Sequence, residues 1–172
     1  DLLDILDRFA PAADYGSDFG ARVYKISRDP QGARLTWLKV TGGKLQVRTP
    51  LTYRDAKDVA VTEKPLQLRL YSGDKFTAAE EAYPGQLVAV TGLSATFAGQ
   101  GLGIETGALA PMLEPVMTYR VELPKGCDPL TFLPKLRLLE EEDPQLHVLW
   151  DDHLKQIHVQ IMGKIQLEIL KS

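Results

Sequence analysis

Two glycine-containing loops in this sequence have residue types that nucleotide-binding sites use. Residues 99–103 read Gly-Gln-Gly-Leu-Gly, and residues 29–32 read Asp-Pro-Gln-Gly, an Asp-x-x-Gly form that can accompany magnesium and a γ-phosphate. A P-loop needs the pattern G-x-x-x-x-G-K-[ST], and no lysine follows the 99–103 loop. The chain contains no Asn, which excludes an Asn-Lys-x-Asp motif for guanine. We therefore predict that both loops are turns.

The other candidates for catalytic or metal chemistry are few. Residues 151–153 read Asp-Asp-His, but they fall in a predicted hairpin turn while His158 falls on the following strand, so these side chains are not expected to converge on a metal. Cys127 has no partner base in the sequence, and we expect it to be structural. The acidic run 140–143 is either a solvated helix end or a surface that faces a basic partner. We predict no catalytic residue and no metal site.

The charge distribution is more informative than the total. The chain has a net charge of -3, with 44% hydrophobic and 25% charged residues, which argues against a disordered, collagenous or membrane-bundle protein. Residues 22–57 nevertheless hold nine Lys and Arg against two Asp, a local charge of +7. Such a stretch can bind an anionic partner such as nucleic acid, or it can be a solvated strand face. Both interpretations stay open at this point.

The pattern of hydrophobic residues predicts three segments. Residues 1–9 have helical spacing, and Pro11 ends that helix. From residue 19 to residue 90 the period changes to two, with turn residues at 29–32 and 41–43, which predicts six or more short strands in a closed barrel or sandwich. The Gly- and Ala-rich residues 92–115 are expected to end this domain.

The remainder follows a different plan. A strand, a helix, two hairpin strands and a second helix are predicted in that order, at residues 116–123, 128–142, 147–150, 157–161 and 164–170. This β-α-β-β-α order is a split βαββαβ, or ferredoxin-like, unit without its last strand. Because the chain also begins at Asp1 rather than Met, we expect it to be a piece of a longer protein.

Several strings along the chain resemble a known family. Residues 162–169 read Met-Gly-Lys-Ile-Gln-Leu-Glu-Ile and follow a Glu-Asp-Pro helix end at 142–144. Together they resemble the third domain of translational GTPases of the elongation factor G type. Residues 34–43 and 82–93 resemble the second domain of that family, a β-barrel, and residues 1–11 resemble the last helix of its GTPase domain.

Within this family, the chain resembles the tetracycline-resistance ribosomal protection proteins in the connection from Tyr-Ser-Gly at 71–73 to Glu-Ala-Tyr-Pro-Gly at 81–85. One departure is that residues 99–103 replace the usual Gly-Asp-Thr-Leu ending of the barrel. The resemblance implies a remnant helix and linker (1–17), a translation-factor-type β-barrel (18–112) and a truncated ferredoxin-like α+β domain (113–172).

The resemblance also implies a function. The chain would form the central, ribosome-binding domains of a GTP-dependent factor, without catalysis of its own, because GTP and Mg would bind in an absent GTPase domain. Its expected partners are that GTPase domain and the small-subunit rRNA and proteins of the ribosome; it is expected to be monomeric, cytoplasmic and not bound to a membrane. The cations expected to contact RNA, at strand ends and turns, are Lys39, Lys44, Arg48, Arg54 and Lys57.

Two alternatives stay open. The parent protein could be elongation factor G itself or a paralogue rather than a ribosomal protection protein. The chain could instead be a standalone small-molecule enzyme with a site between its two domains, although no acid, base and nucleophile set is evident in the sequence.

Overall fold

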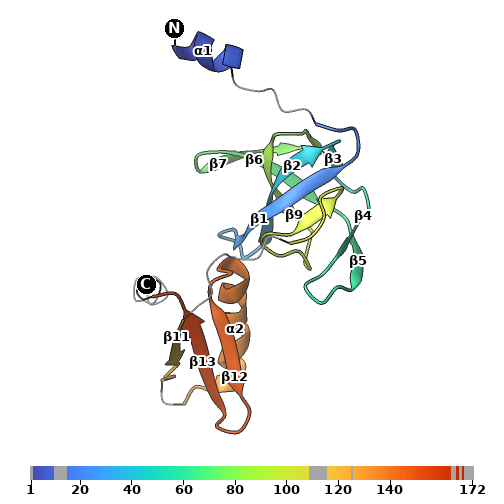
Figure 1. Cartoon of the computed structure of the whole chain (residues 1–172). Coiled ribbons are helices and arrows are strands. Elements are labelled where there is room, and N and C mark those ends of the chain that lie inside the picture. The colour runs from blue at the N-terminus through green and yellow to red at the C-terminus, as the bar shows by residue number, and fades with distance from the viewer. Residues whose placement is uncertain are drawn as a thin grey trace.

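The computed structural model describes residues 2–9, 15–108, 116–124 and 126–163, together with residues 166 and 168. Three parts follow one another in Figure 1: helix α1 (Leu2–Phe9), a body of short strands, and a smaller unit of one helix and three strands. The helix expected at the N-terminus is therefore confirmed. The helix expected at 164–170 and the domain boundary expected at 112/113 fall mainly on residues outside the described ranges.

The body between residues 20 and 103 contains ten strands. They are β1 (Gly20–Arg28), β2 (Arg34–Gly42), β3 (Leu45–Gln46), β4 (Leu51–Arg54), β5 (Ala60–Glu63), β6 (Gln67–Ser72), β7 (Lys75–Ala79), β8 (Glu81–Ala82), β9 (Leu87–Thr91) and β10 (Gly101–Gly103). Six of them form one antiparallel sheet in the order β10-β1-β2-β9-β6-β7, while β3 pairs with β8 and β4 with β5. The chain thus forms the succession of short antiparallel strands that its period of two predicts.

One hydrophobic core joins all of these strands into a barrel. In the large sheet, Val23 pairs with Leu38 and Leu38 with Val88, and all three side chains are fully buried. Leu45 on β3 and Tyr53 on β4 belong to the same buried cluster, so the small strand pairs close over the core of the large sheet. Because side chains alternate between the two faces of a strand, the residues next to these point to the outside of the barrel.

The loop at 29–32 is the turn that the sequence predicts. Asp29 Oδ1 accepts hydrogen bonds from the backbone N–H groups of Gln31 and Ala33, at 3.0 and 2.8 Å. Gly32 has a φ of 83°, which a glycine adopts without steric cost. The other carboxylate oxygen of Asp29 lies 2.9 Å from Arg69 Nη1, which ties the turn to β6.

The loop at 99–103 differs from the prediction, because most of it is strand β10, paired with β1. Its glycines serve close packing of two backbones. A Cβ atom on Gly103 would lie 2.0 Å from the carbonyl oxygen of Phe19, and its φ is 65°. The prediction of a turn was wrong because spacing alone does not separate a glycine required by a turn from one required by a neighbouring strand.

The second unit has the predicted order of elements. It consists of β11 (Met117–Arg120), α2 (Pro129–Glu142), β12 (His147–Asp151) and β13 (Gln156–Ile161), with the sheet order β11-β13-β12. Asp128 caps α2 by accepting a hydrogen bond from the N–H of Leu130. This sheet order is that of the first three strands of a split βαββαβ unit. The fold class expected from the sequence, a translation-factor-type barrel followed by a small α+β unit, is confirmed.

Candidate nucleic-acid interface

The five cations expected to contact RNA lie in three places on the barrel. Lys39 is inside β2, not at a strand end as expected, and its exposed side chain lies on the outer face, where it pairs in register with Leu87 of β9. Lys44 and Arg48 flank the short strand β3, and Arg54 and Lys57 lie in the β4–β5 hairpin. Figure 1 shows β3 near the upper end of the barrel and the β4–β5 hairpin projecting at its side. The five residues therefore do not form one cluster.

The two cations that flank β3 differ in their surroundings. Lys44 Nζ lies 2.9 Å from Glu81 Oε1. Hydrogen bonds from Lys44, Tyr83 and Gln46 lower the pKa of Glu81 from 4.5 to about 2, and the bond with Glu81 raises the pKa of Lys44. Arg48 is exposed and has a φ of 63°, a left-handed conformation in which its backbone N–H donates to Pro65 O. Only Arg48 of this pair presents a charge without a carboxylate beside it among the described residues.

The hairpin cations differ in the same way. Arg54 Nη1 lies 3.2 Å from Asp58 Oδ2 and donates to the backbone oxygen of Asp58 at 2.9 Å. Lys57 is exposed in the turn, where Asp55 Oδ1 accepts from its backbone N–H and leaves the ammonium group to solvent. Lys57 is thus the accessible charge of the hairpin.

Much of the basic stretch is neutralised by acids outside it, most of which lie far away in the sequence. Five of its nine cations form ion pairs with carboxylates: Arg22 with Glu105, Arg28 and Arg34 with Glu141, Lys44 with Glu81, and Arg54 with Asp58. Within the described part of the chain, four cations have no such partner: Lys25, Lys39, Arg48 and Lys57. The local charge of +7 therefore overstates the positive charge that this surface offers to a ligand.

One residue of the acidic run at the end of α2, Glu141, faces a basic partner, and that partner is the barrel. Glu141 Oε2 lies 3.2 Å from Arg28 Nη2 and 3.3 Å from Arg34 Nε. Arg34 also donates to the carbonyl oxygens of Leu93 and Thr96, at 2.6 and 2.5 Å, so its guanidinium group is fixed to the barrel. Sequence reasoning missed this junction, because an Arg and a Glu more than 100 residues apart carry no mutual signal.

An aromatic cluster on the outside of the barrel was also missed. The ring centroids of Trp37 and Tyr71 are 4.8 Å apart, and those of Tyr71 and Phe76 are 5.4 Å apart. The guanidinium carbon of Arg69 lies 4.6 Å from the centroid of Phe76. The sequence did hold a signal for part of this cluster. Tyr71 and Phe76 stand on either side of a tight turn, which puts them opposite each other in the β6–β7 hairpin.

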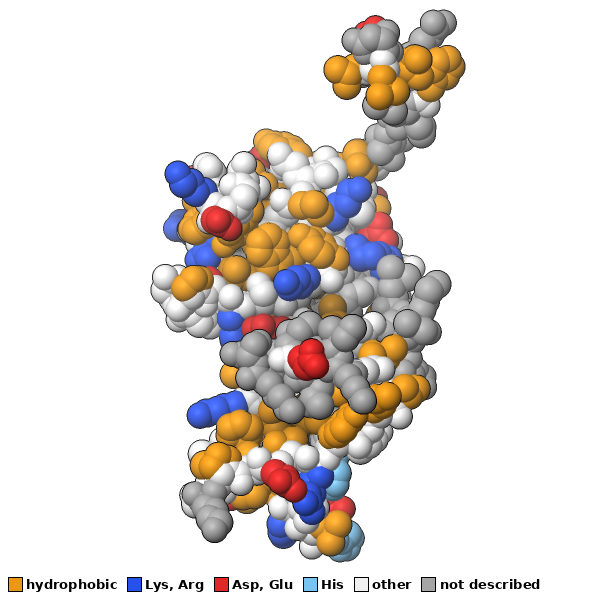
Figure 2. All heavy atoms as spheres, turned by 90° about the vertical axis from the view of Figure 1, so that its left-hand side faces the viewer, with side chains coloured by type: hydrophobic (Ala, Val, Ile, Leu, Met, Phe, Trp, Pro, Cys, Tyr) orange, Lys and Arg blue, Asp and Glu red, His pale blue; other side chains and the backbone are white. Residues whose placement is uncertain are grey.

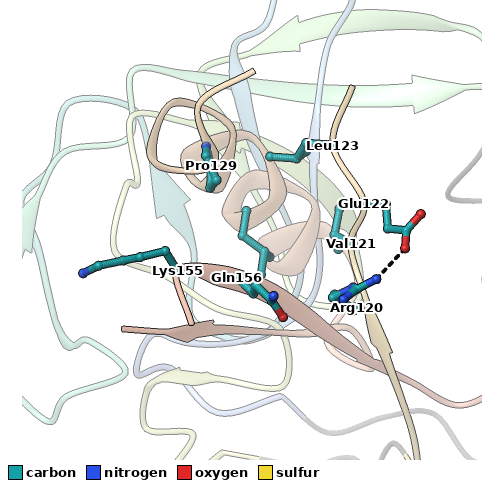
Figure 3. Close-up of a pocket in the computed structure, with 8 residues that line it drawn as sticks. Arg120, Val121, Glu122, Leu123, Pro129, Lys155 and Gln156 are labelled. Carbon is teal, nitrogen blue, oxygen red and sulfur yellow. Dashed lines mark hydrogen bonds and ion pairs between the residues drawn. The ribbon is translucent and has the colours of Figure 1, made fainter. Parts of the chain in front are cut away.

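Two cavities lie in different units. A cavity of about 470 Å³ in the barrel is lined by the β4–β5 hairpin and residues 97–108. A second, of about 370 Å³, lies in the α+β unit between the start of α2, the end of β11 and the β12–β13 turn (Figure 3). Both cations at this second cavity are paired, Arg120 with Glu122 at 2.6 Å and Lys155 with Asp152 at 2.9 Å. Neither of these two cavities lies between the barrel and the α+β unit.

Neither of the two glycine-containing loops is shaped to hold GTP or Mg²⁺. The carboxylate of Asp29 is occupied by Arg69 and two backbone N–H groups, while Gly101 packs against Glu105 and Gly103 against Phe19. No group of three or more His, Cys, Asp and Glu able to hold a metal ion is present in the described ranges. No described helix is both long and apolar enough to cross a membrane.

Known proteins resemble this chain over its whole length. The tetracycline resistance protein TetP of Clostridium perfringens is 30% identical over 177 residues, which is 100% of this chain and 26% of that protein. Elongation factor G of Pseudothermotoga lettingae is 31% identical over 157 residues, 89% of this chain and 22% of that protein. Elongation factor G 2 of Syntrophus aciditrophicus is 26% identical over 95% of this chain and 24% of its own length. The chain therefore spans about a quarter of the length of these relatives.

A similarity of fold accompanies the similarity of sequence. A crystal structure of a protein from Thermus thermophilus superposes with a TM-score of 0.68 at 21% identity, over 98% of this chain and 26% of the other. The family model of elongation factor G domain 2 matches residues 18–103, which include every strand of the barrel. Because the family model matches its barrel and the relatives are similar to it along its length, the chain belongs to the elongation factor G family and carries domain 2 of that family.

Proposed function

We propose that this chain forms the central, ribosome-binding part of a GTP-dependent translation factor of the tetracycline-resistance ribosomal protection type. The observation that carries the proposal is the match of the barrel to elongation factor G domain 2, together with similarity to TetP along the whole chain. GTP and Mg²⁺ bind to a separate GTPase domain of the parent protein, which works in the cytoplasm as a monomer. The residues of this chain do not hydrolyse GTP.

The barrel contacts the small-subunit rRNA and proteins through its accessible cations. Lys39, Arg48 and Lys57 are exposed, and their side-chain charges form no ion pair with a described carboxylate, so RNA phosphates are their natural partners. Lys44 and Arg54 contribute less, because a phosphate would have to compete with Glu81 and Asp58. Contacts of this kind bind RNA without sequence preference and weaken with salt.

The test is a comparison of GTP hydrolysis by the full-length parent and by this chain, with and without ribosomes. We expect the parent to hydrolyse GTP faster when ribosomes are present and this chain to show no turnover. GTP turnover by the purified chain would contradict the proposal. A parent whose rate of GTP hydrolysis is the same with and without ribosomes would contradict it too.

A translation assay of the parent, run with and without tetracycline, separates the protection type from elongation factor G. Elongation factor G relatives are as similar to this chain as TetP is, at 31% and 30% identity, so identity does not decide between them. If the parent restores translation on tetracycline-blocked ribosomes, the protection type is supported. If it drives elongation and leaves tetracycline inhibition unchanged, the parent is an elongation factor G.

A further inference from the structure

We propose that the outer face of the barrel sheet binds unpaired RNA nucleotides, whose bases stack on Trp37, Tyr71 and Phe76 while Lys25 and Lys39 hold the phosphates. We call Trp37, Tyr71 and Phe76, together with Arg69, the aromatic platform. The choice of RNA as the partner rests on the proposed function, whereas the surface itself is an observation about the barrel. The proposal adds a base-stacking site to the phosphate contacts at Arg48 and Lys57.

Strand register places the platform on a single face. Trp37 pairs with Lys25 on one side and with Ala89 on the other, and Ala89 pairs with Arg69. Paired residues of antiparallel strands share a face, and Trp37 is next to the inward-pointing Leu38, so this row points outward. Tyr71 is two residues beyond Arg69 and therefore lies on the same face.

The platform is held in place before any ligand arrives. Trp37 Nε1 donates to Ser27 Oγ at 2.7 Å, and Arg69 is fixed by Asp29 at 2.9 Å while its guanidinium group lies over Phe76. The three rings contact one another in series, with interplanar angles of 42° and 43°. Rings held in this way lose little freedom on binding, which favours stacking of a flexible ligand.

The exposed positive charges around the platform favour binding of an anion. Lys25 and Lys39 are exposed on the same face, and the described residues provide no carboxylate for them, while Asp29 is already paired with Arg69. On the side of the barrel that carries β6 and β7, Figure 2 shows hydrophobic side chains gathered together with Lys and Arg side chains around them. Aromatic rings that are exposed in full or in part, beside unpaired cations, match a single-stranded nucleic acid, which offers a flat base and a phosphate at each nucleotide.

The chain provides its own reporter for the test. It has two tryptophans, Trp37 on the platform and Trp150 in the α+β unit, so in Trp150→Phe the fluorescence comes from Trp37 alone. A ten-nucleotide oligouridylate is titrated against an abasic strand with the same number of phosphates. We expect quenching by the oligouridylate only, and about tenfold or tighter binding than for the abasic strand.

Variants separate stacking from charge. We expect Tyr71→Leu and Phe76→Leu each to weaken oligouridylate binding by about fivefold or more while the abasic strand binds as before. Tyr83→Leu is the matched control, because Tyr83 is an exposed tyrosine off the platform, in the turn between β8 and β9. Lys25→Gln and Lys39→Gln should reduce the salt dependence without removing the quenching. Thermal unfolding of each variant identifies any that does not fold.

The outcomes that overturn the proposal are distinct. Equal affinity for the abasic strand, or binding without quenching, means that the face attracts charge alone. Equally tight binding of a ten-residue polyglutamate means that the occupant is an acidic protein. If oligouridylate does not stack on the platform but neutralising Arg48 and Lys57 weakens ribosome binding by the parent, this inference is wrong and the proposed function stands. If oligouridylate does not stack and the neutralised parent binds ribosomes as before, both proposals are wrong.

Discussion

The barrel and the α+β unit differ in how much of themselves they bury. Among the described residues, the barrel encloses thirteen buried residues in one hydrophobic cluster, whereas the cluster of the α+β unit has five. Helix α2 buries none of its residues completely and contains Pro134 in its interior. Since burial of apolar surface is the main stabilising term in folding, the barrel is expected to be stable alone, and the α+β unit to depend on its neighbours.

This difference assigns different tasks to the two units. The cations proposed to contact RNA (Lys39, Arg48 and Lys57) and the aromatic platform lie on the barrel, which has the larger buried core. The α+β unit is joined to it by Glu141, whose carboxylate reaches two barrel arginines. We therefore expect the barrel to set where the protein binds, and α2 to carry any movement between the units.

The largest expected effects come from matched core truncations. Leu38 in the barrel and Leu146 in the α+β unit are 0% and 1% exposed, and replacing either with Ala should cost about 2–5 kcal/mol. We expect Leu38→Ala to lower the stability of a barrel that remains folded, and Leu146→Ala to unfold the α+β unit while the barrel persists. Urea unfolding followed through Trp37 and Trp150 separately reads the two units.

A single tryptophan in each unit makes this comparison direct. In Trp150→Phe the remaining signal reports the barrel, and in Trp37→Phe it reports the α+β unit. Coincident transitions of the two reporters in Leu146→Ala would show that the units unfold together, which would contradict the independent stability expected of the barrel.

The sequence predicted the elements better than the contacts between them. The period of two gave β1, β2, β6, β7 and β9, since alternation is local, and the helical spacing of Leu130, Leu133 and Leu136 along one stripe gave α2. Of that leucine stripe, Leu133 and Leu136 pack on the sheet, while Leu130 remains 58% exposed. Spacing did not show that β10 would pair with β1, because that pairing joins residues about 80 positions apart.

The candidate site was predicted only in part for the same reason. Lys39, Arg48 and Lys57 are exposed as expected, but the pairing of Lys44 with Glu81 and of Arg34 with Glu141 follows from the folded chain. A count of charges along the sequence does not include acids that folding brings to the same place. The aromatic platform has a similar origin, because Trp37 meets Tyr71 only through the order of strands in the sheet.

A smaller effect is expected at the junction between the units. Glu141→Gln removes the charge that attracts Arg28 and Arg34, and because Glu141 is partly exposed the cost in stability should be no more than about 1 kcal/mol. The expected result is a larger radius of gyration by X-ray scattering, since the units separate more often. Glu142→Gln is the matched control at the neighbouring position. A radius that is unchanged in Glu141→Gln would show that this ion pair does not hold the units together.

The smallest effect is in the pH dependence, and it should differ between the units. Among the described carboxylates, Asp29, Glu63, Glu81 and Glu105 in the barrel have a lowered pKa, against Asp152 in the α+β unit. For Glu81 the hydrogen bonds from Lys44, Tyr83 and Gln46 lower the pKa from 4.5 to about 2. A lowered pKa means that the unfolded chain takes up protons first as the pH falls.

The sign of this effect is therefore fixed. The stability that Glu81 contributes is present above pH 4.5 and is lost as the pH falls toward about 2. We expect the free energy of unfolding of the barrel to fall less steeply below pH 4.5 in Glu81→Gln than in the unsubstituted chain. The measurement is urea unfolding at a series of pH values, followed by the fluorescence of Trp37. If Glu81→Gln loses stability as steeply at low pH as the unsubstituted chain does, Glu81 is not responsible for that loss.

The central claim is that the barrel, through its unpaired cations, binds the ribosome. The most direct test is the salt dependence of ribosome affinity of the full-length parent carrying Arg48→Asn and Lys57→Gln, where Asn suits the left-handed conformation of residue 48. Lys135→Gln on α2 is the control, because it removes one exposed lysine from the other unit. We predict weaker binding and a salt slope lower by roughly one for each barrel cation, with no change for Lys135→Gln. Unchanged affinity and slope in the barrel variant would contradict the claim.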